Sequence, residues 1–187
     1  LYLAAALTAE RDFESAASCH RQAVALEPES ADMRNQLGNA LQKAKHYDDA
    51  LAAYAQALEL DPSHAVVHSN IGAVLHDLRR FEEALESYRK AIELDASFAA
   101  AHMNMGMAHR LLNQYDEAIA AFRKAIDLRP DYLEAHTSLG ASLCEKGLLE
   151  EAIISCRAAL AIDPQCAPVH SNLLFCITHL DYTDHAV

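Results

Sequence analysis

Residues 99–132 read AAAHMNMGMAHRLLNQYDEAIAAFRKAIDLRPDY, and the same pattern recurs before and after them at an interval of 34 residues. The residues that recur in register are one glycine and two alanines, at Gly38, Gly72, Gly106 and Gly140, at Ala50, Ala84, Ala118 and Ala152, and at Ala57, Ala91, Ala125 and Ala159. A period of this length built from two amphipathic helices is typical of a solenoid, whose repeats pack on their neighbours. We therefore expect the chain to present a surface rather than to catalyse a reaction.

Numbering each repeat from the position of Ala31 divides residues 1–187 into one continuous array. Its segments are a partial repeat at 1–30, full repeats at 31–64, 65–98, 99–132 and 133–166, and the start of a divergent terminal repeat or junction at 167–187. Within each full repeat, apolar residues at helical spacing predict a helix over positions 1–14 and another over positions 18–31. Position 15 separates them, and of its four occupants only Gly147 is the preferred left-handed cap, with Asn113 the next best.

Small residues recur at positions 8, 20 and 27 of each repeat, and large residues at positions 17 and 24. This pattern resembles the tetratricopeptide repeat (TPR) family over essentially the whole chain. The resemblance implies an all-α fold, a right-handed superhelix of antiparallel helix pairs. In that fold the first helix of each pair lines a concave groove and the second lies outside.

The composition narrows the possible partners. The chain has 15 basic and 27 acidic residues and a net charge of −12, which disfavours binding to nucleic acid or to an anionic membrane. No apolar run approaches the roughly 20 residues of a membrane span. The five cysteines are odd in number and form no C-x-x-C pair, so we expect a reducing, cytoplasmic compartment and small buried thiols.

Two recurrent groups of titratable residues fit structural roles better than chemical ones. Acid pairs such as Glu82-Glu83 begin each second helix, where the helix dipole favours negative charge. Histidines occupy position 4 in four repeats (His68, His102, His136, His170), but equivalent positions lie roughly 10 Å or more apart and cannot share one metal ion. We expect these histidines to pack between helices. No catalytic, metal-binding or cofactor-binding motif is recognised, so we expect no enzyme activity or cofactor in this chain.

The remaining candidate is the concave groove, which the family resemblance assigns to positions 2, 5, 6, 9, 12 and 13. Position 6 is occupied by Gln36, Asn70, Asn104, Ser138 and Asn172. An amide side chain donates and accepts hydrogen bonds, so such a column suits an extended polypeptide of little sequence preference. Asn39 at position 9 and Arg110 at position 12 extend the predicted peptide-binding set. The alternative is a solvated polar face.

An apolar stripe adjoins this column in the repeat 99–132. Met103, Met107 and Leu111 are spaced i, i+4 and i+8, while other residues of the same helix fill its core positions. We expect the stripe to face the groove, where flexible methionines suit varied contacts. The alternative is a covered seam between helices.

The regular pattern breaks at Leu174, where other repeats have glycine. The segment HSNLLFCITHLDYTDHA, from His170 to Ala186, resembles the junction at which bacterial O-linked N-acetylglucosamine transferase-like proteins pass from TPRs into their catalytic domain. The opening His102-Met103-Asn104-Met105-Gly106 is also similar to that family. The resemblance implies that the parent protein is a peptide O-glycosyltransferase whose catalytic domain lies outside this chain.

Two functions follow as hypotheses. The first is a non-catalytic scaffold that binds protein or extended peptide in its concave groove, as the substrate-recruiting arm of a glycosyltransferase-like protein. The second is an assembly module that forms homo-oligomers through exposed terminal helices or its convex surface.

Overall fold

The computed structural model describes residues 12–184, and every regular element in this range is an α-helix. The helices are α2 (Phe13–Leu26), α3 (Ala31–Lys43), α4 (Tyr47–Leu60), α5 (Ala65–Asp77), α6 (Phe81–Leu94), α7 (Ala99–Leu111), α8 (Tyr115–Leu128), α9 (Leu133–Glu145), α10 (Leu149–Ile162) and α11 (Ala167–Asp184). In the four full repeats, each boundary lies within one residue of the prediction. The all-α solenoid class expected from the sequence is confirmed.

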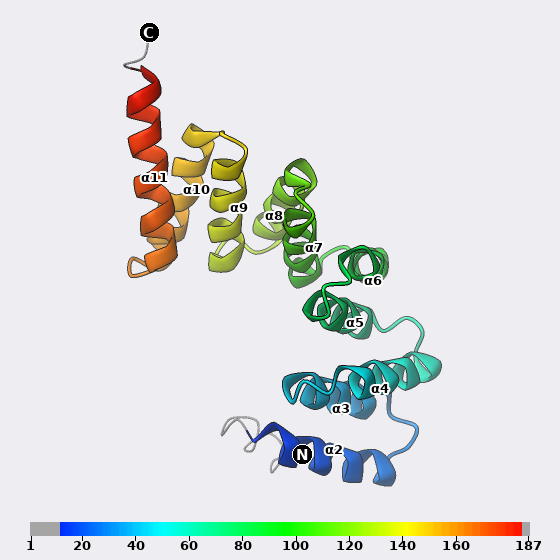
Figure 1. Cartoon of the computed structure of the whole chain (residues 1–187). Helices are drawn as coiled ribbons and strands as arrows, with labels where there is room; N and C mark the ends of the chain where they lie inside the picture. Colours follow the sequence, from blue (N-terminus) through cyan, green and yellow to red (C-terminus); the bar gives the residue numbers. More distant parts are fainter. Residues whose placement is uncertain (1–11, 185–187) are drawn as a thin grey trace. The chain divides into compact units, whose positions relative to one another are not determined.

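The chain divides into two compact units, one ending at Ala96 and the other beginning at Ser97. In the first unit α3 packs on α4 and α5 on α6, with α2 against α3 and α4 against α5 (Figure 1). In the second unit α7 packs on α8 and α9 on α10, with α8 against α9 and α11 against both α9 and α10. Each unit is therefore built from helix pairs that share one local arrangement.

The turn inside each pair depends on a left-handed residue at position 15. Lys45, Arg79 and Asn113 have φ of 64°, 61° and 59°, and Gly147 has φ of 80°. The backbone geometry predicted from Gly147 and Asn113 thus holds for all four repeats, including the two where a long basic side chain occupies the position. Those two positions carry a conformational cost, because a Cβ disfavours left-handed backbone.

In three of the four pairs that make up full repeats, a glycine on the first helix faces an aromatic ring on the second. A Cβ built at Gly72 would lie 2.5 Å from Tyr88 Cε1, and one at Gly106 would lie 2.6 Å from Phe122 Cε1. Gly38 has the same relationship to Tyr54. All three rings are at most 1% exposed. The small residue at position 8 is required because the ring at position 24 fills the space that a side chain would need.

Helix α11 departs from this pattern. It spans 18 residues, whereas the other first helices span 13, and it continues past the point where they turn. Leu174, at the position where the four full repeats have glycine, is 64% exposed, and its neighbours Phe175 and Ile177 are exposed as well. No helix in the described part of the chain is both long and apolar enough to span a bilayer.

Candidate functional site

In the first unit, three asparagines from two first helices form a hydrogen-bonded cluster. Asn70 on α5 donates through Nδ2 to Asn35 Oδ1 at 2.8 Å and to Asn39 Oδ1 at 3.0 Å, both on α3. Tyr54 reaches from α4 and donates its hydroxyl to Asn39 Oδ1 at 2.8 Å. Asn35 is only 8% exposed, whereas Asn39 and Asn70 are half-buried. The structure thus brings together two of the predicted peptide-binding residues, Asn39 and Asn70.

The cluster leaves part of its hydrogen-bonding capacity open. Both N–H groups of Asn70 are used, so its carbonyl oxygen is the group that remains. Asn39 accepts two hydrogen bonds through Oδ1, and among residues 12–184 its Nδ2 has no partner. One free acceptor and one free donor, on adjacent helices, match the alternating N–H and C=O groups of an extended backbone.

A second polar link lies further along the same pair of helices. Gln42 on α3 donates through Nε2 to Asp77 Oδ2 on α5 at 3.1 Å. Like Asn35 and Asn70, these residues lie 35 apart in the chain, so position n of one first helix meets position n+1 of the next. Asn35, Tyr54 and Gln42 were not among the predicted site residues. Of these three, Asn35 and Gln42 occupy positions 5 and 12, which the family resemblance assigns to the groove, whereas Tyr54 lies on a second helix.

The second unit uses the same spacings with different chemistry. Arg110 on α7 donates through Nη1 to Glu145 Oε1 on α9 at 3.0 Å, again 35 residues apart. Ser138 on α9 donates its hydroxyl to the sulfur of Met107 on α7 at 3.5 Å. The Nε of Arg110 is buried without a hydrogen-bond partner among the described residues. Arg110 is therefore partly committed to an ion pair within the protein.

The predicted apolar stripe divides into buried and exposed parts. Met103 is 7% exposed and belongs to the core cluster of the second unit, together with Ile119 and Phe122. Met107 is half-buried and packs against the same cluster, whereas Leu111 is 41% exposed. The expectation that Met103 faces a groove is wrong, because its side chain fills the core of its own unit. Leu111 alone of the three offers a largely open apolar surface.

The remaining predicted residues lie on first helices without forming a cluster. Gln36 on α3, Asn104 on α7 and Asn172 on α11 are all half-buried. Their binding role stays a prediction. The amide column is thus a hydrogen-bonded cluster at Asn70 and a set of separate side chains elsewhere.

Three of the four histidines at position 4 hydrogen-bond to the loop that connects their repeat to the preceding one. The Nε2 of His68 donates to the carbonyl of Pro62 at 3.2 Å, and His136 and His170 donate to Pro130 and Pro164 at 2.9 Å each. In every case the acceptor lies six residues earlier, in the turn that ends the preceding second helix. At these three positions the histidine ring therefore has a structural role in the connection between repeats.

The cysteine prediction needs correction. Cys144 on α9 and Cys176 on α11 form a disulfide, with Cα atoms 6.6 Å apart, so Cys176 is not a simple buried thiol. Cys156 is fully buried as expected, and burial raises the pKa of its thiol. With two of the five cysteines paired, the cysteines no longer indicate a reducing compartment.

The chain is an all-α array of helix pairs, and polar side chains on the first helices form contacts between neighbouring repeats. Family models described as tetratricopeptide repeat match residues 3–65 and 35–99, residues 99–132, and residues 133–166. The chain belongs to the tetratricopeptide repeat family.

Solved structures agree on the fold. MamA from Desulfovibrio magneticus superposes with a TM-score of 0.74 and 22% identity over 89% of this chain and 94% of that chain. YrrB, described as a TPR protein with an unusual peptide-binding site, superposes with a TM-score of 0.74 and 25% identity, covering 88% of this chain and 85% of that chain. A thermophilic TPR protein of Thermus thermophilus superposes with a TM-score of 0.77 and 20% sequence identity, covering 95% of this chain and 97% of that chain. A comparison with curated proteins found no match.

Proposed function

We propose that this chain is a non-catalytic scaffold that binds extended polypeptide along the face of its first helices. The observation that carries the proposal is the cluster of Asn35, Asn39 and Asn70, which holds a free carbonyl oxygen and a free amide nitrogen at fixed positions on α3 and α5. Such fixed groups bind backbone without first losing rotamer entropy. The peptide-binding site of YrrB, a protein of the same fold, supports the same reading.

The finer part of the proposal is that the scaffold recruits substrates for a glycosyltransferase-like protein. It rests on the resemblance of the segment from His170 to Ala186 to the junction in transferase-like proteins. The sequence that follows Val187 in the gene tests it directly. A nucleotide-sugar-binding α/β region would support the transferase role, while further repeats or a stop codon would exclude it.

The experiment for the groove compares peptide binding by the wild-type chain and an Asn39→Ala/Asn70→Ala variant. Fluorescence anisotropy with a panel of labelled extended peptides should show binding weakened about tenfold, because two backbone hydrogen bonds are lost. Glu86→Ala, an exposed substitution on α6, serves as the matched control and should bind like wild type. Unchanged binding by the double variant would contradict the proposed role of the cluster.

A second candidate function is self-association, and the exposed apolar residues of α11 favour it. Leu174, Phe175 and Ile177 lie within four residues of one another and are 64%, 47% and 38% exposed. Light scattering over a range of concentrations tests this candidate. A dimer that a Leu174→Glu/Phe175→Glu variant converts to monomer would establish it, and a wild-type monomer would exclude it.

A further inference from the structure

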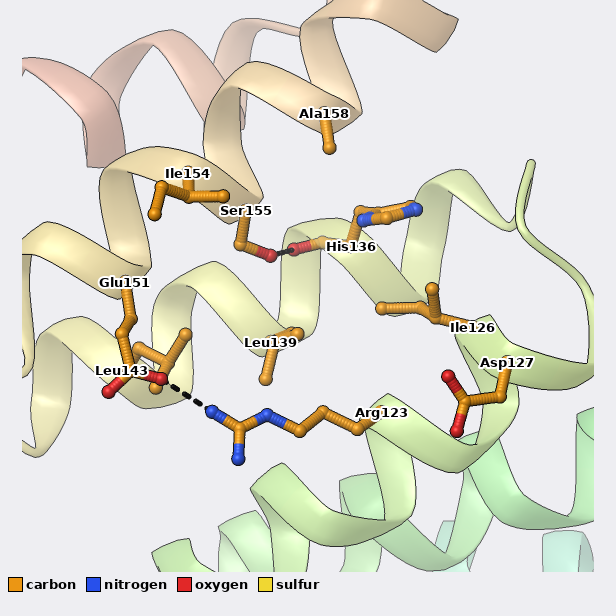
Figure 2. A pocket seen from close by; sticks show the side chains of 10 residues that line it. All are labelled: Arg123, Ile126, Asp127, His136, Leu139, Leu143, Glu151, Ile154, Ser155 and Ala158. Atoms are coloured by element: carbon orange, nitrogen blue, oxygen red, sulfur yellow. Dashed lines mark hydrogen bonds and ion pairs between the residues drawn. The ribbon is translucent and has the colours of Figure 1, made fainter.

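A pocket of about 370 Å³ opens between α8, α9 and α10 of the second unit (Figure 2). Its apolar lining comes from Ile126 on α8, Leu139 and Leu143 on α9, and Ile154 on α10. Leu139 and Leu143 are 8% and 1% exposed and form the floor, whereas Ile154 is 68% exposed at the rim. The volume lies at the lower end of the range of about 300–1,000 Å³ found for ligand sites.

This pocket is separate from the face of the proposed peptide site. Its residues occupy repeat positions 4, 7, 11, 19, 22, 23, 25, 26, 28 and 29, none of which is assigned to the concave groove. Most of them belong to the second helices α8 and α10. An occupant would therefore bind independently of Asn39 and Asn70.

Apart from Asp127, the polar side chains that line the pocket already have partners within the protein. Ser155 donates its hydroxyl to the carbonyl of His136 at 3.0 Å, and Arg123 forms an ion pair with Glu151 (Figure 2). The His136 ring in turn donates to Pro130. An occupant consequently gains most by burying apolar surface against the leucine floor and Ile154.

Two residues of the pocket depart from the repeat pattern. At position 26 the other full repeats have long polar side chains, Gln56, Lys90 and Lys124, whereas this repeat has Ala158. At position 22 they have Ala52, Glu86 and Ala120, whereas this repeat has Ile154. The short side chain of Ala158 leaves space at one position, and Ile154 adds exposed apolar surface at the other. Ile154 adds little to the packing of α10 on α9, since its side chain is mostly exposed.

The charges at the rim indicate the chemistry of the occupant. Arg123 and Glu151 neutralise one another, while Asp127 is exposed and has no ion-pair partner among the described residues. We propose that the pocket binds an apolar side chain of a partner polypeptide that carries a lysine or arginine beside it, with the cation paired to Asp127. The net charge of −12 disfavours a second copy of this chain as the occupant.

The test uses a phage library of random 12-residue peptides, selected on the wild-type chain. The comparison variant is Ile154→Glu/Ala158→Lys, which introduces the residues that the repeat 65–98 has at the same two positions and so should fold normally, as checked by circular dichroism. Selected peptides should combine an aliphatic or aromatic residue with a lysine or arginine. Their affinity should fall at least about tenfold for the variant, the loss expected when one apolar side chain is no longer buried.

Two further variants keep the outcomes distinct. Asp127→Asn should weaken binding of the basic peptides about two- to fivefold and reduce its salt dependence, as for an exposed ion pair. Asn39→Ala/Asn70→Ala should leave binding of these peptides unchanged. A failure of the pocket proposal can therefore be told apart from a failure of the proposed peptide site at Asn39 and Asn70. If every selected peptide binds the Ile154→Glu/Ala158→Lys variant as tightly as the wild-type chain, the proposal is wrong. Light scattering that shows a wild-type dimer dissociated by that change would also overturn it, because the occupant would then be a second copy.

Discussion

Gly72 on α5 and Tyr88 on α6 lie so close that a Cβ on the glycine would overlap the ring, at 2.5 Å from Cε1. The ring is 1% exposed and its neighbourhood is closely packed, so it has little room to move away. The same contact recurs at Gly106 with Phe122, whereas Gly140 faces the smaller Cys156. The four repeats therefore differ in how much space their position-8 residue is allowed.

We predict that Gly72→Ala lowers the free energy of unfolding by about 1–3 kcal/mol, the usual cost of overpacking a core. Gly140→Ala should cost less, because its Cβ would lie 3.0 Å from the Cys156 sulfur and at ordinary contact distance, 3.7 Å, from its next neighbours. Urea denaturation of both variants provides the comparison. Equal losses would mean that the aromatic ring is not the obstacle.

The left-handed turn residues offer stabilising substitutions. Lys45→Gly and Arg79→Gly should each raise the free energy of unfolding by about 0.5–1 kcal/mol, since glycine adopts φ near 60° without the Cβ penalty. Gly147→Ala should lower it by about 1 kcal/mol at φ 80°, although the added Cβ meets no neighbour within 4 Å. Chemical denaturation checks all three, and opposite signs would contradict this account of the turns.

The second unit should depend on its disulfide. Reduction, or a Cys144→Ala/Cys176→Ala variant, should lower the stability of this unit by about 2–4 kcal/mol, because the bond closes a loop with a sequence separation of 32. Ellman titration of the denatured, unreduced protein should find thiols only at Cys19, Cys156 and Cys166. Five reactive thiols before reduction would show that the bond does not form.

Stability should also depend on the protonation of His76. Burial lowers the pKa of this histidine below its ordinary 6.5, against a smaller opposing effect of Asp77, and its Nε2 has no hydrogen-bond partner among the described residues. The unfolded chain therefore binds the proton more readily than the folded one. Stability should fall as the pH drops below about 6.5, towards the lower pKa of the folded state.

A His76→Gln variant isolates this effect, because all other titrating groups remain. Urea midpoints measured at about pH 8 and about pH 5 should differ less for the variant than for wild type. If the urea midpoints of the wild type and the variant fall by the same amount between about pH 8 and about pH 5, another titrating group accounts for the loss of stability.

Sequence reasoning located the helices because each boundary depends on local signals that recur. The left-handed position was evident from Gly147 and Asn113, and Lys45 and Arg79 follow by register alone. The contacts between repeats were harder to foresee. Adjacent first helices meet through separations of 31, 32 and 35 residues, and a pattern of period 34 does not choose among them.

The two largest differences between the sequence-based predictions and the structure have the same physical origin. Met103 is placed on the groove side by its position number, but in the structure it fills the core beside Phe122. Cys144 and Cys176 occupy different repeat positions, so neither predicts the other. Both depend on how far one helix is rotated and shifted against the next, which helical spacing alone does not determine.

The bonds from position-4 histidines to proline carbonyls bear on how the array unfolds. Each spans the connection between one repeat and the next, as His136 does with Pro130. In a linear array, stability is the sum of the intrinsic stability of each repeat and a coupling energy between neighbours. These bonds add to the coupling energy, so their number affects how many repeats unfold together as well as how stable each one is.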